Sequence, residues 1–108
     1  MDDRRKTERF PTSFYVFWGE TEECLRSGKV TSLSAGGCFI QTRAPVAKGD
    51  LIFIRLPRPT EGWLLLRGEV VYYLQKAGPG VRFVELKDED RSVLAQLIEH
   101  YREDRTAH

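Results

Sequence analysis

The chain has 108 residues and a mass of 12.5 kDa, which is enough for one domain around a single core. Its 17 Lys and Arg residues against 16 Asp and Glu residues leave a net charge of +1, which excludes a general attraction to nucleic acid or to an anionic membrane. The opening MDDRRKTERF contains no apolar run, and no stretch approaches the roughly 18 apolar residues of a transmembrane helix. We therefore expect a soluble protein of the cytoplasm.

Residues 1–9 are almost entirely charged or polar, and we expect them to form a flexible N-terminal arm. Residues 10–104 are predicted to form the folded domain. Aromatic and β-branched residues predict a first strand over Ser13–Trp18. Similar runs predict five more strands, at Leu25–Leu33, Cys38–Thr42, Leu51–Leu56, Leu64–Leu74 and Val81–Val84.

Turn residues separate these strands. Ser34–Gly37 and Lys48–Asp50 carry glycines suited to tight reversals, residues 57–62 form a longer loop, and Ala77–Gly80 is predicted to close a hairpin. Short strands at such even spacing favour an antiparallel barrel or sandwich. The runs at 63–66 and 70–74 are apolar on both faces, which indicates that another element packs on the sheet.

The last segment is predicted to be that element. Asp88 is a candidate N-cap for a helix that runs to about Glu103. An apolar stripe recurs at helical spacing, formed by Val93, Leu94, Leu97, Ile98 and Tyr101. We expect this amphipathic helix to lie across the sheet.

The residues of an enzyme are missing from the sequence. The histidines are His100 and the terminal His108, and no nucleophile with an acid–histidine pair is evident. Neither these histidines nor Cys24 and Cys38 have the close spacing of a zinc site, and the phosphate-cradling P-loop pattern is absent. We predict no catalytic residue, no metal and no cofactor, and we expect Cys38 to be a buried, reduced thiol.

Two features favour an anion site. Arg5 and Arg9 are four residues apart, and planar guanidinium groups suit phosphate oxygens and the O6/N7 edge of guanine. The second feature, residues 32–37, is rich in serine and glycine, so that backbone amides could approach a ligand closely. Taken separately, a solubilising arm and an ordinary hairpin turn are the simpler explanations of these two features.

Taken together, the two features resemble the PilZ domain family, receptors for the bacterial second messenger cyclic di-GMP. That family carries R-x-x-x-R at the mouth of a six-stranded antiparallel barrel and D/N-x-S-x-x-G on the following strands. Arg5 and Arg9 match the first motif, and Ser34 and Gly37 match the second. The strings LSAGGCFI, LRGEVVY and GVRF and a closing helix follow in the family's order over about residues 4–103. The implied fold is a mostly β, PilZ-like six-stranded barrel with a C-terminal helix packed on it.

The resemblance also implies a mechanism. Arg5 and Arg9 would fold over cyclic di-GMP from the arm, and Ser34 with the Gly36–Gly37 backbone would hold it against the barrel wall. Ordering of the arm would then present a new surface to a partner protein. Arg4, directly before the first motif arginine, resembles members that capture a self-stacked ligand dimer.

One position departs from the motif. Ser32 stands where the family has Asp or Asn, and its hydroxyl cannot accept two hydrogen bonds from a guanine edge as a carboxylate can. Tyr72 and Arg82 are second-rank candidate contacts, with a packed aromatic residue and a solvated strand residue as the plain alternatives.

Two rival functions remain open. A degenerate PilZ-like domain could bind protein alone, through the apolar face near Trp63 or through the closing helix. A small barrel could also bind single-stranded nucleic acid through Tyr15, Phe17 and Trp18, although the near-neutral charge speaks against it. The sequence leaves the partner and the oligomeric state undetermined.

Overall fold

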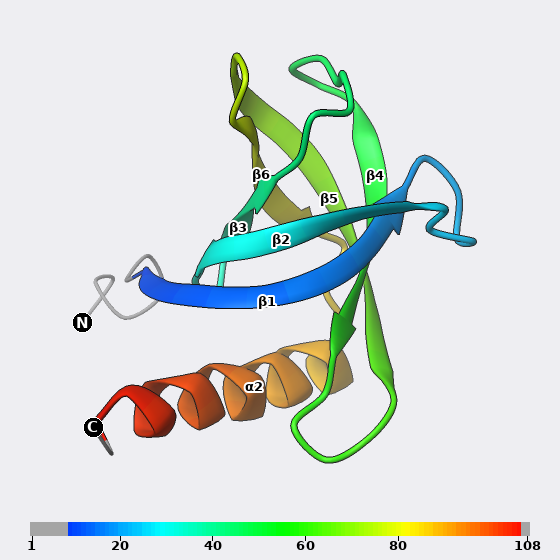
Figure 1. Ribbon diagram of the computed structural model, residues 1–108. Coiled ribbons are helices and arrows are strands. Elements are labelled where there is room, and N and C mark those ends of the chain that lie inside the picture. Colours follow the sequence, from blue (N-terminus) through cyan, green and yellow to red (C-terminus); the bar gives the residue numbers. More distant parts are fainter. Residues whose placement is uncertain (1–8, 107–108) are drawn as a thin grey trace, which may run out of the picture.

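Six strands wind into a closed antiparallel barrel with a long helix beside it in the computed structural model, which describes the backbone of residues 9–106 and the side chains of residues 9–101 (Figure 1). In chain order the elements are β1 (Phe10–Gly19), β2 (Arg26–Leu33), β3 (Gly37–Gln41), β4 (Leu51–Pro57), β5 (Trp63–Leu74), β6 (Gly78–Val84) and α2 (Asp88–Thr106). The predicted barrel and closing helix are confirmed. No helix in this part of the chain is long and apolar enough to cross a bilayer.

The strands follow one another around the barrel as β1-β2-β3-β6-β5-β4, and β1 closes the ring by pairing with β4. Trp18 lies at this closure, opposite Arg26 of β2 and Ile54 of β4. The alternation of buried and exposed side chains along β1 and β5 follows the period of two that a strand imposes, which sends every second side chain into the barrel.

The barrel interior is the hydrophobic core. Its largest fully buried side chains are Trp18, Leu33, Ile40, Ile52, Ile54 and Leu56 together with Leu94 and Leu97 of the helix. The Trp18 indole donates its N–H to the carbonyl of Ser27 at 3.3 Å, which satisfies its polar atom in the core. Trp18 therefore cannot join Tyr15 and Phe17 in an exposed base-stacking stripe, and that part of the nucleic-acid alternative is wrong.

The hairpin between β5 and β6 turns earlier than predicted. The turn residues are Gln75, Lys76 and Ala77, with Lys76 in the left-handed region at φ 70°. Gly78 and Gly80, expected in the turn, belong to β6 instead. A Cβ on Gly78 would lie 2.0 Å from the carbonyl oxygen of Ile40, so this glycine serves a close approach of two backbones.

The helix begins with a different cap from the predicted one. The Asp90 carboxylate accepts the backbone N–H of Lys87 at 3.3 Å, and the first helical N–H, that of Arg91, donates to the Lys87 carbonyl. Lys87 is therefore the N-cap, and the prediction of Asp88 in that role is wrong. An acidic residue at the third helical position bonds back to the cap residue, as in a capping box. The helix also continues to Thr106, beyond the expected end near Glu103.

The helix covers one end of the barrel. Leu94 and Leu97 are buried with Phe14 of β1, and the Phe14 ring stacks on Tyr101 with centroids 4.7 Å apart and planes 10° apart. Figure 1 shows α2 running alongside β1 below the barrel. The outer face of β5 is left uncovered, because Trp63 and Leu65 remain 48% and 39% exposed. The helix contacts β5 and β1, as expected of an element that packs on the sheet, but it does not cover these two residues.

Candidate ligand-binding site

Most of the predicted site residues that the structure describes lie around the turn between β2 and β3 and the neighbouring part of β6. Pairing of Phe10 with Leu33 brings the beginning of β1 beside the end of β2. Arg9, directly before β1, reaches across and donates from Nη1 to the Ser32 hydroxyl at 3.4 Å. Among the described side chains, those of residues 9–101, no carboxylate pairs with Arg9. Arg4 and Arg5 lie outside the described residues.

The turn after β2 is shaped by the Ser34 side chain, which is buried at 4% exposure. Its hydroxyl oxygen accepts the N–H groups of Gly36 and Gly37 at 3.2 and 3.1 Å, and its O–H donates to the Gly37 carbonyl at 3.3 Å. The two glycine amides that could have faced an anion therefore already have a partner. What the turn offers a ligand is a surface with few side chains, onto which a large group can come close.

Gly37 fixes this turn against β6. A Cβ at this position would lie 2.1 Å from the carbonyl oxygen of Val81, so only glycine permits the approach of β3 to β6. The Gly36 carbonyl also accepts the N–H of Phe83 at 2.8 Å. Both glycines of the turn therefore contact β6, Gly36 through a hydrogen bond and Gly37 through close backbone packing.

A shallow cavity of 310 Å³ brings most of the described candidates together, and its lining residues include Arg9, Ser34, Gly36, Gly37 and Arg82. Arg82 is exposed on β6, opposite Gly37 in the strand register, and it forms an ion pair with Glu69 of β5. Because Glu69 already offsets the charge of Arg82, Arg9 supplies the guanidinium of this cavity that best suits a phosphate.

Tyr72 has a definite place on the same outer surface. The strand register aligns Ser32, Phe39, Gly80 and Tyr72 in one row across β2, β3, β6 and β5. The Tyr72 ring lies over Gly80, where a Cβ would be 2.2 Å from the ring, and stacks on Phe39 with centroids 6.3 Å apart. Phe39 was not predicted as part of the site. Its alternation with the buried Cys38 and Ile40 is the signal that places it on the outer face.

The residues beneath this surface are inert. Burial raises the pKa of the Cys38 thiol to about 12, and the nearby charge of Arg9 offsets only part of this effect. A thiol with such a pKa stays protonated near neutral pH and is a poor nucleophile. Both cysteines are free, and residues 9–106 contain no group of three metal-ligating side chains. The geometry therefore suits binding of a ligand from outside.

Comparisons with known proteins agree with this architecture. Residues 3–100 match the model of the PilZ domain family. The crystal structure of the PilZ domain of CeSA from a cellulose-synthesising bacterium superposes with a TM-score of 0.69 at 15% identity, covering 88% of this chain and 98% of that one. The Bacillus subtilis inhibitor of motility, MotI/DgrA, gives a TM-score of 0.57 at 18% identity, covering 86% of this chain and 48% of that one.

At these identities the two solved structures establish the fold alone. A search of curated proteins finds no match. The family match covers nearly the whole folded domain, and its barrel and helix are those of the structure. The chain belongs to the PilZ domain family, a family of cyclic di-GMP receptors.

Proposed function

We propose that this domain is a non-catalytic receptor that binds cyclic di-GMP on the outer face of β2, β3 and β6, beneath Arg5 and Arg9. The observation that carries the proposal is the position of Arg9. Its guanidinium reaches Ser32 at 3.4 Å and borders the shallow cavity, with no carboxylate partner among the side chains that the structure describes. A guanidinium beside a surface of small residues can turn to a phosphate without first breaking an ion pair.

Each part of the site has a role in this proposal. Arg9 and Arg5 pair with phosphate oxygens and guanine edges, and Arg82 adds a further guanidinium on the opposite side of the cavity. Gly36 and Gly37 let the ligand lie close to the backbone, and Ser34 holds their turn in shape. Arg4 supports binding of a self-stacked ligand dimer, as in family members with a basic residue at this place.

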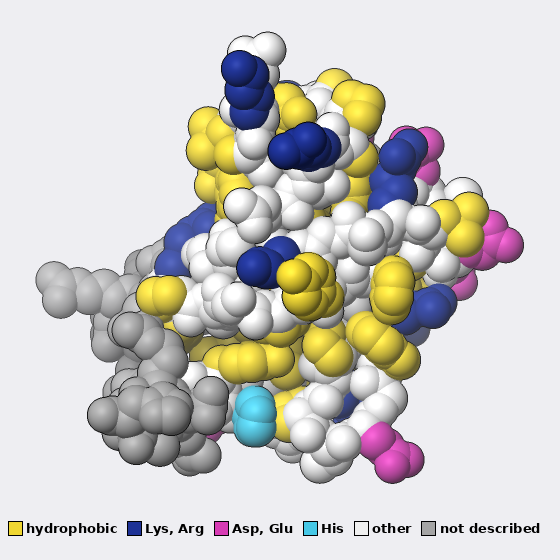
Figure 2. Space-filling model, viewed as in Figure 1, with side chains coloured by type: hydrophobic (Ala, Val, Ile, Leu, Met, Phe, Trp, Pro, Cys, Tyr) yellow, Lys and Arg dark blue, Asp and Glu magenta, His cyan; other side chains and the backbone are white. Residues whose placement is uncertain are grey.

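The signal is relayed to a partner protein in the cytoplasm. Tyr15, Phe17 and Trp63 are exposed on the outer face of the barrel, and the rings of Phe17 and Trp63 contact each other with centroids 5.7 Å apart. Figure 2 shows hydrophobic side chains at the surface at the level of β1. The names of the two solved relatives, one from a cellulose-synthesising bacterium and the other an inhibitor of motility, support an output in exopolysaccharide or motility control.

Calorimetric titration of the full chain with cyclic di-GMP tests the proposal. We expect saturable binding by the wild type, and a loss of about tenfold or more in affinity for Arg9→Ala and for Arg5→Ala, because each removes a charge-assisted hydrogen bond. Arg58→Ala is the matched control, since Arg58 is an exposed arginine of the β4–β5 loop, outside the shallow cavity. The melting temperature of the free protein should stay the same in all three variants.

The alternative is a PilZ domain that has lost the ligand and binds protein alone. The specific observation in its favour is the same exposed aromatic face, which needs no ligand in order to dock on a partner. Absence of heat and of any thermal shift at saturating cyclic di-GMP would establish this alternative and overturn the receptor proposal.

A further inference from the structure

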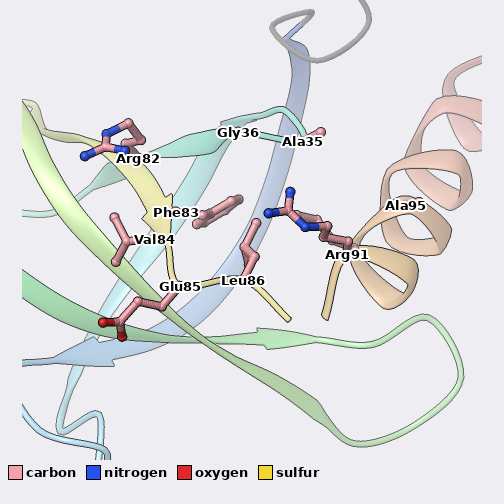
Figure 3. Close-up of a pocket in the computed structure, with 10 residues that line it drawn as sticks. Ala35, Gly36, Arg82, Phe83, Val84, Glu85, Leu86, Arg91 and Ala95 are labelled. Carbon is pink, nitrogen blue, oxygen red and sulfur yellow. The ribbon is translucent and has the colours of Figure 1, made fainter. Parts of the chain in front are cut away.

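A second and larger cavity, of 540 Å³, lies where β6 leads into α2 (Figure 3). Its apolar walls include Phe83 of β6, Leu86 of the segment between β6 and α2, and Leu94 of the helix. The Ser34–Gly37 turn forms another side through Ala35 and Gly36. Phe83 and Leu94 are 6% and 2% exposed, so these walls are firmly packed. Such a cavity suits the flat, apolar face of a purine.

The charged groups of this cavity are mainly basic. Arg91, in the first turns of α2, has no ion-pair partner among the side chains of residues 9–101. Figure 3 shows its guanidinium directed from the helix towards the β6 side of the cavity. Glu85 is the one acidic residue in the lining, and its carboxylate is already paired with Arg67 at 2.9 Å. In Figure 3 it points away from Arg91. An anion entering the cavity therefore meets an unpaired guanidinium.

The two cavities adjoin at the turn, because Gly36 and Arg82 line both. Arg9 borders the smaller cavity, as Arg91 borders the larger. On the turn itself, Ala35 carries a single methyl group and Gly36 has no side chain, so both leave room for a ligand above the backbone. A ligand with two phosphates and two bases has the groups to occupy both cavities at once.

We propose that Arg91 is a further ligand-binding residue, which takes a phosphate oxygen or a guanine edge of cyclic di-GMP in the larger cavity. The inference rests on the proposed function and extends the site from the arm to the helix. The consequence is a direct link between ligand and α2, whose Leu94 lies beside Arg91 in the cavity lining and in the core. Ligand binding would then stabilise the helix as well as the arm.

Calorimetric titration of the full chain with cyclic di-GMP tests this assignment in Arg91→Ala and Arg91→Lys. We expect Arg91→Ala to weaken binding by about tenfold or more, and Arg91→Lys to recover only part of the loss, since lysine keeps the charge without the planar fork. Lys87→Ala is the matched control. It removes a positive charge one turn away, from an exposed residue outside this cavity, and should change affinity by less than about twofold.

Amide hydrogen exchange gives a second readout. Cyclic di-GMP should increase the protection of residues 92–98 in the wild type, and this increase should be lost in Arg91→Ala even at saturating ligand. Equal affinity and equal protection in Arg91→Ala and wild type, with Arg9→Ala still impaired, would overturn the role of Arg91 and leave the receptor proposal standing. An equal loss in Lys87→Ala would also overturn it. Absence of binding by the wild type would overturn both proposals together.

Discussion

The Nη1 atom of Arg9 donates a hydrogen bond to the hydroxyl oxygen of Ser32, 3.4 Å away, and so joins the chain before β1 to the outer face of β2. A hydroxyl oxygen carries no net charge, and at this distance the bond is weak. An Asp at the same place, as in the family motif, would offer a guanine edge two acceptor oxygens where Ser32 offers a single hydroxyl oxygen. The serine therefore weakens the acceptor that the barrel presents to a guanine.

Ser32→Asp is expected to tighten cyclic di-GMP binding by about one to two orders of magnitude, since a carboxylate can accept two hydrogen bonds from the N1/N2 edge of guanine. Calorimetric titration measures the change. Ser32→Asn is the control for charge, because an amide oxygen accepts from the same guanine edge without a negative charge. The affinity of Ser32→Asn for cyclic di-GMP should lie between those of the wild type and Ser32→Asp. Unchanged or weaker binding by Ser32→Asp would show that the carboxylate is occupied by Arg9 instead.

Most of the fold could be predicted from the sequence, because apolar residues recur at every second position in a strand and at every third or fourth position in a helix. The errors fall where one residue type has two physical uses. Gly78 and Gly80 were expected in a turn, yet they allow close contacts within the barrel, with the Ile40 carbonyl and the Tyr72 ring. The sequence does not show what a glycine faces, so it cannot separate these uses.

The site was predictable only in part. Arg9, Ser32 and Gly37, which the motif spacing singled out, lie around one turn of the barrel, and their role as ligand contacts stays a prediction. The sequence does not show which groups a side chain bonds to. The Ser34 hydroxyl, expected to face a ligand, accepts two N–H groups of its own turn instead. Arg91 also lacked a sequence signal, because its position beside the turn depends on how α2 docks on the barrel end.

Gly80→Ala is expected to lower the free energy of unfolding by about 1 kcal/mol, because the added Cβ would displace the exposed Tyr72 ring from its stacking contact with Phe39. Chemical denaturation checks the value. The contact is with the far end of a side chain, so the cost should fall to less than about 0.5 kcal/mol when Tyr72 is already alanine. A double-mutant cycle without such coupling would contradict the placement of Tyr72 over Gly80.

Leu97→Ala should destabilise the domain by about 2–5 kcal/mol, because Leu97 is 1% exposed and fills the barrel end beneath α2. Urea denaturation of the wild type and of Leu97→Ala measures the loss of stability. Gln96→Ala, at the preceding exposed position of the helix, is the matched control and should change stability by no more than about 0.5 kcal/mol. Equal stabilities of the two variants would mean that the helix is not part of the core.

Cys38 predicts a loss of stability at alkaline pH. Burial raises the pKa of its thiol from the ordinary 9.0 to about 12 in the folded protein. Between these values the unfolded chain releases the proton while the folded barrel retains it, so rising pH favours unfolding. The thiol should therefore lower the free energy of unfolding by about 1.4 kcal/mol per pH unit above pH 9, and should contribute no slope below it.

Chemical denaturation of wild type and Cys38→Ala at a series of pH values isolates this contribution. Lysines and tyrosines titrate in the same range, but they are common to both proteins and cancel in the difference. The alanine leaves a small cavity, which costs the same at every pH and so shifts the curve without tilting it. Parallel curves above pH 9 would contradict the prediction, since a thiol shielded from water inside the barrel must withhold its proton longer than one in the unfolded chain.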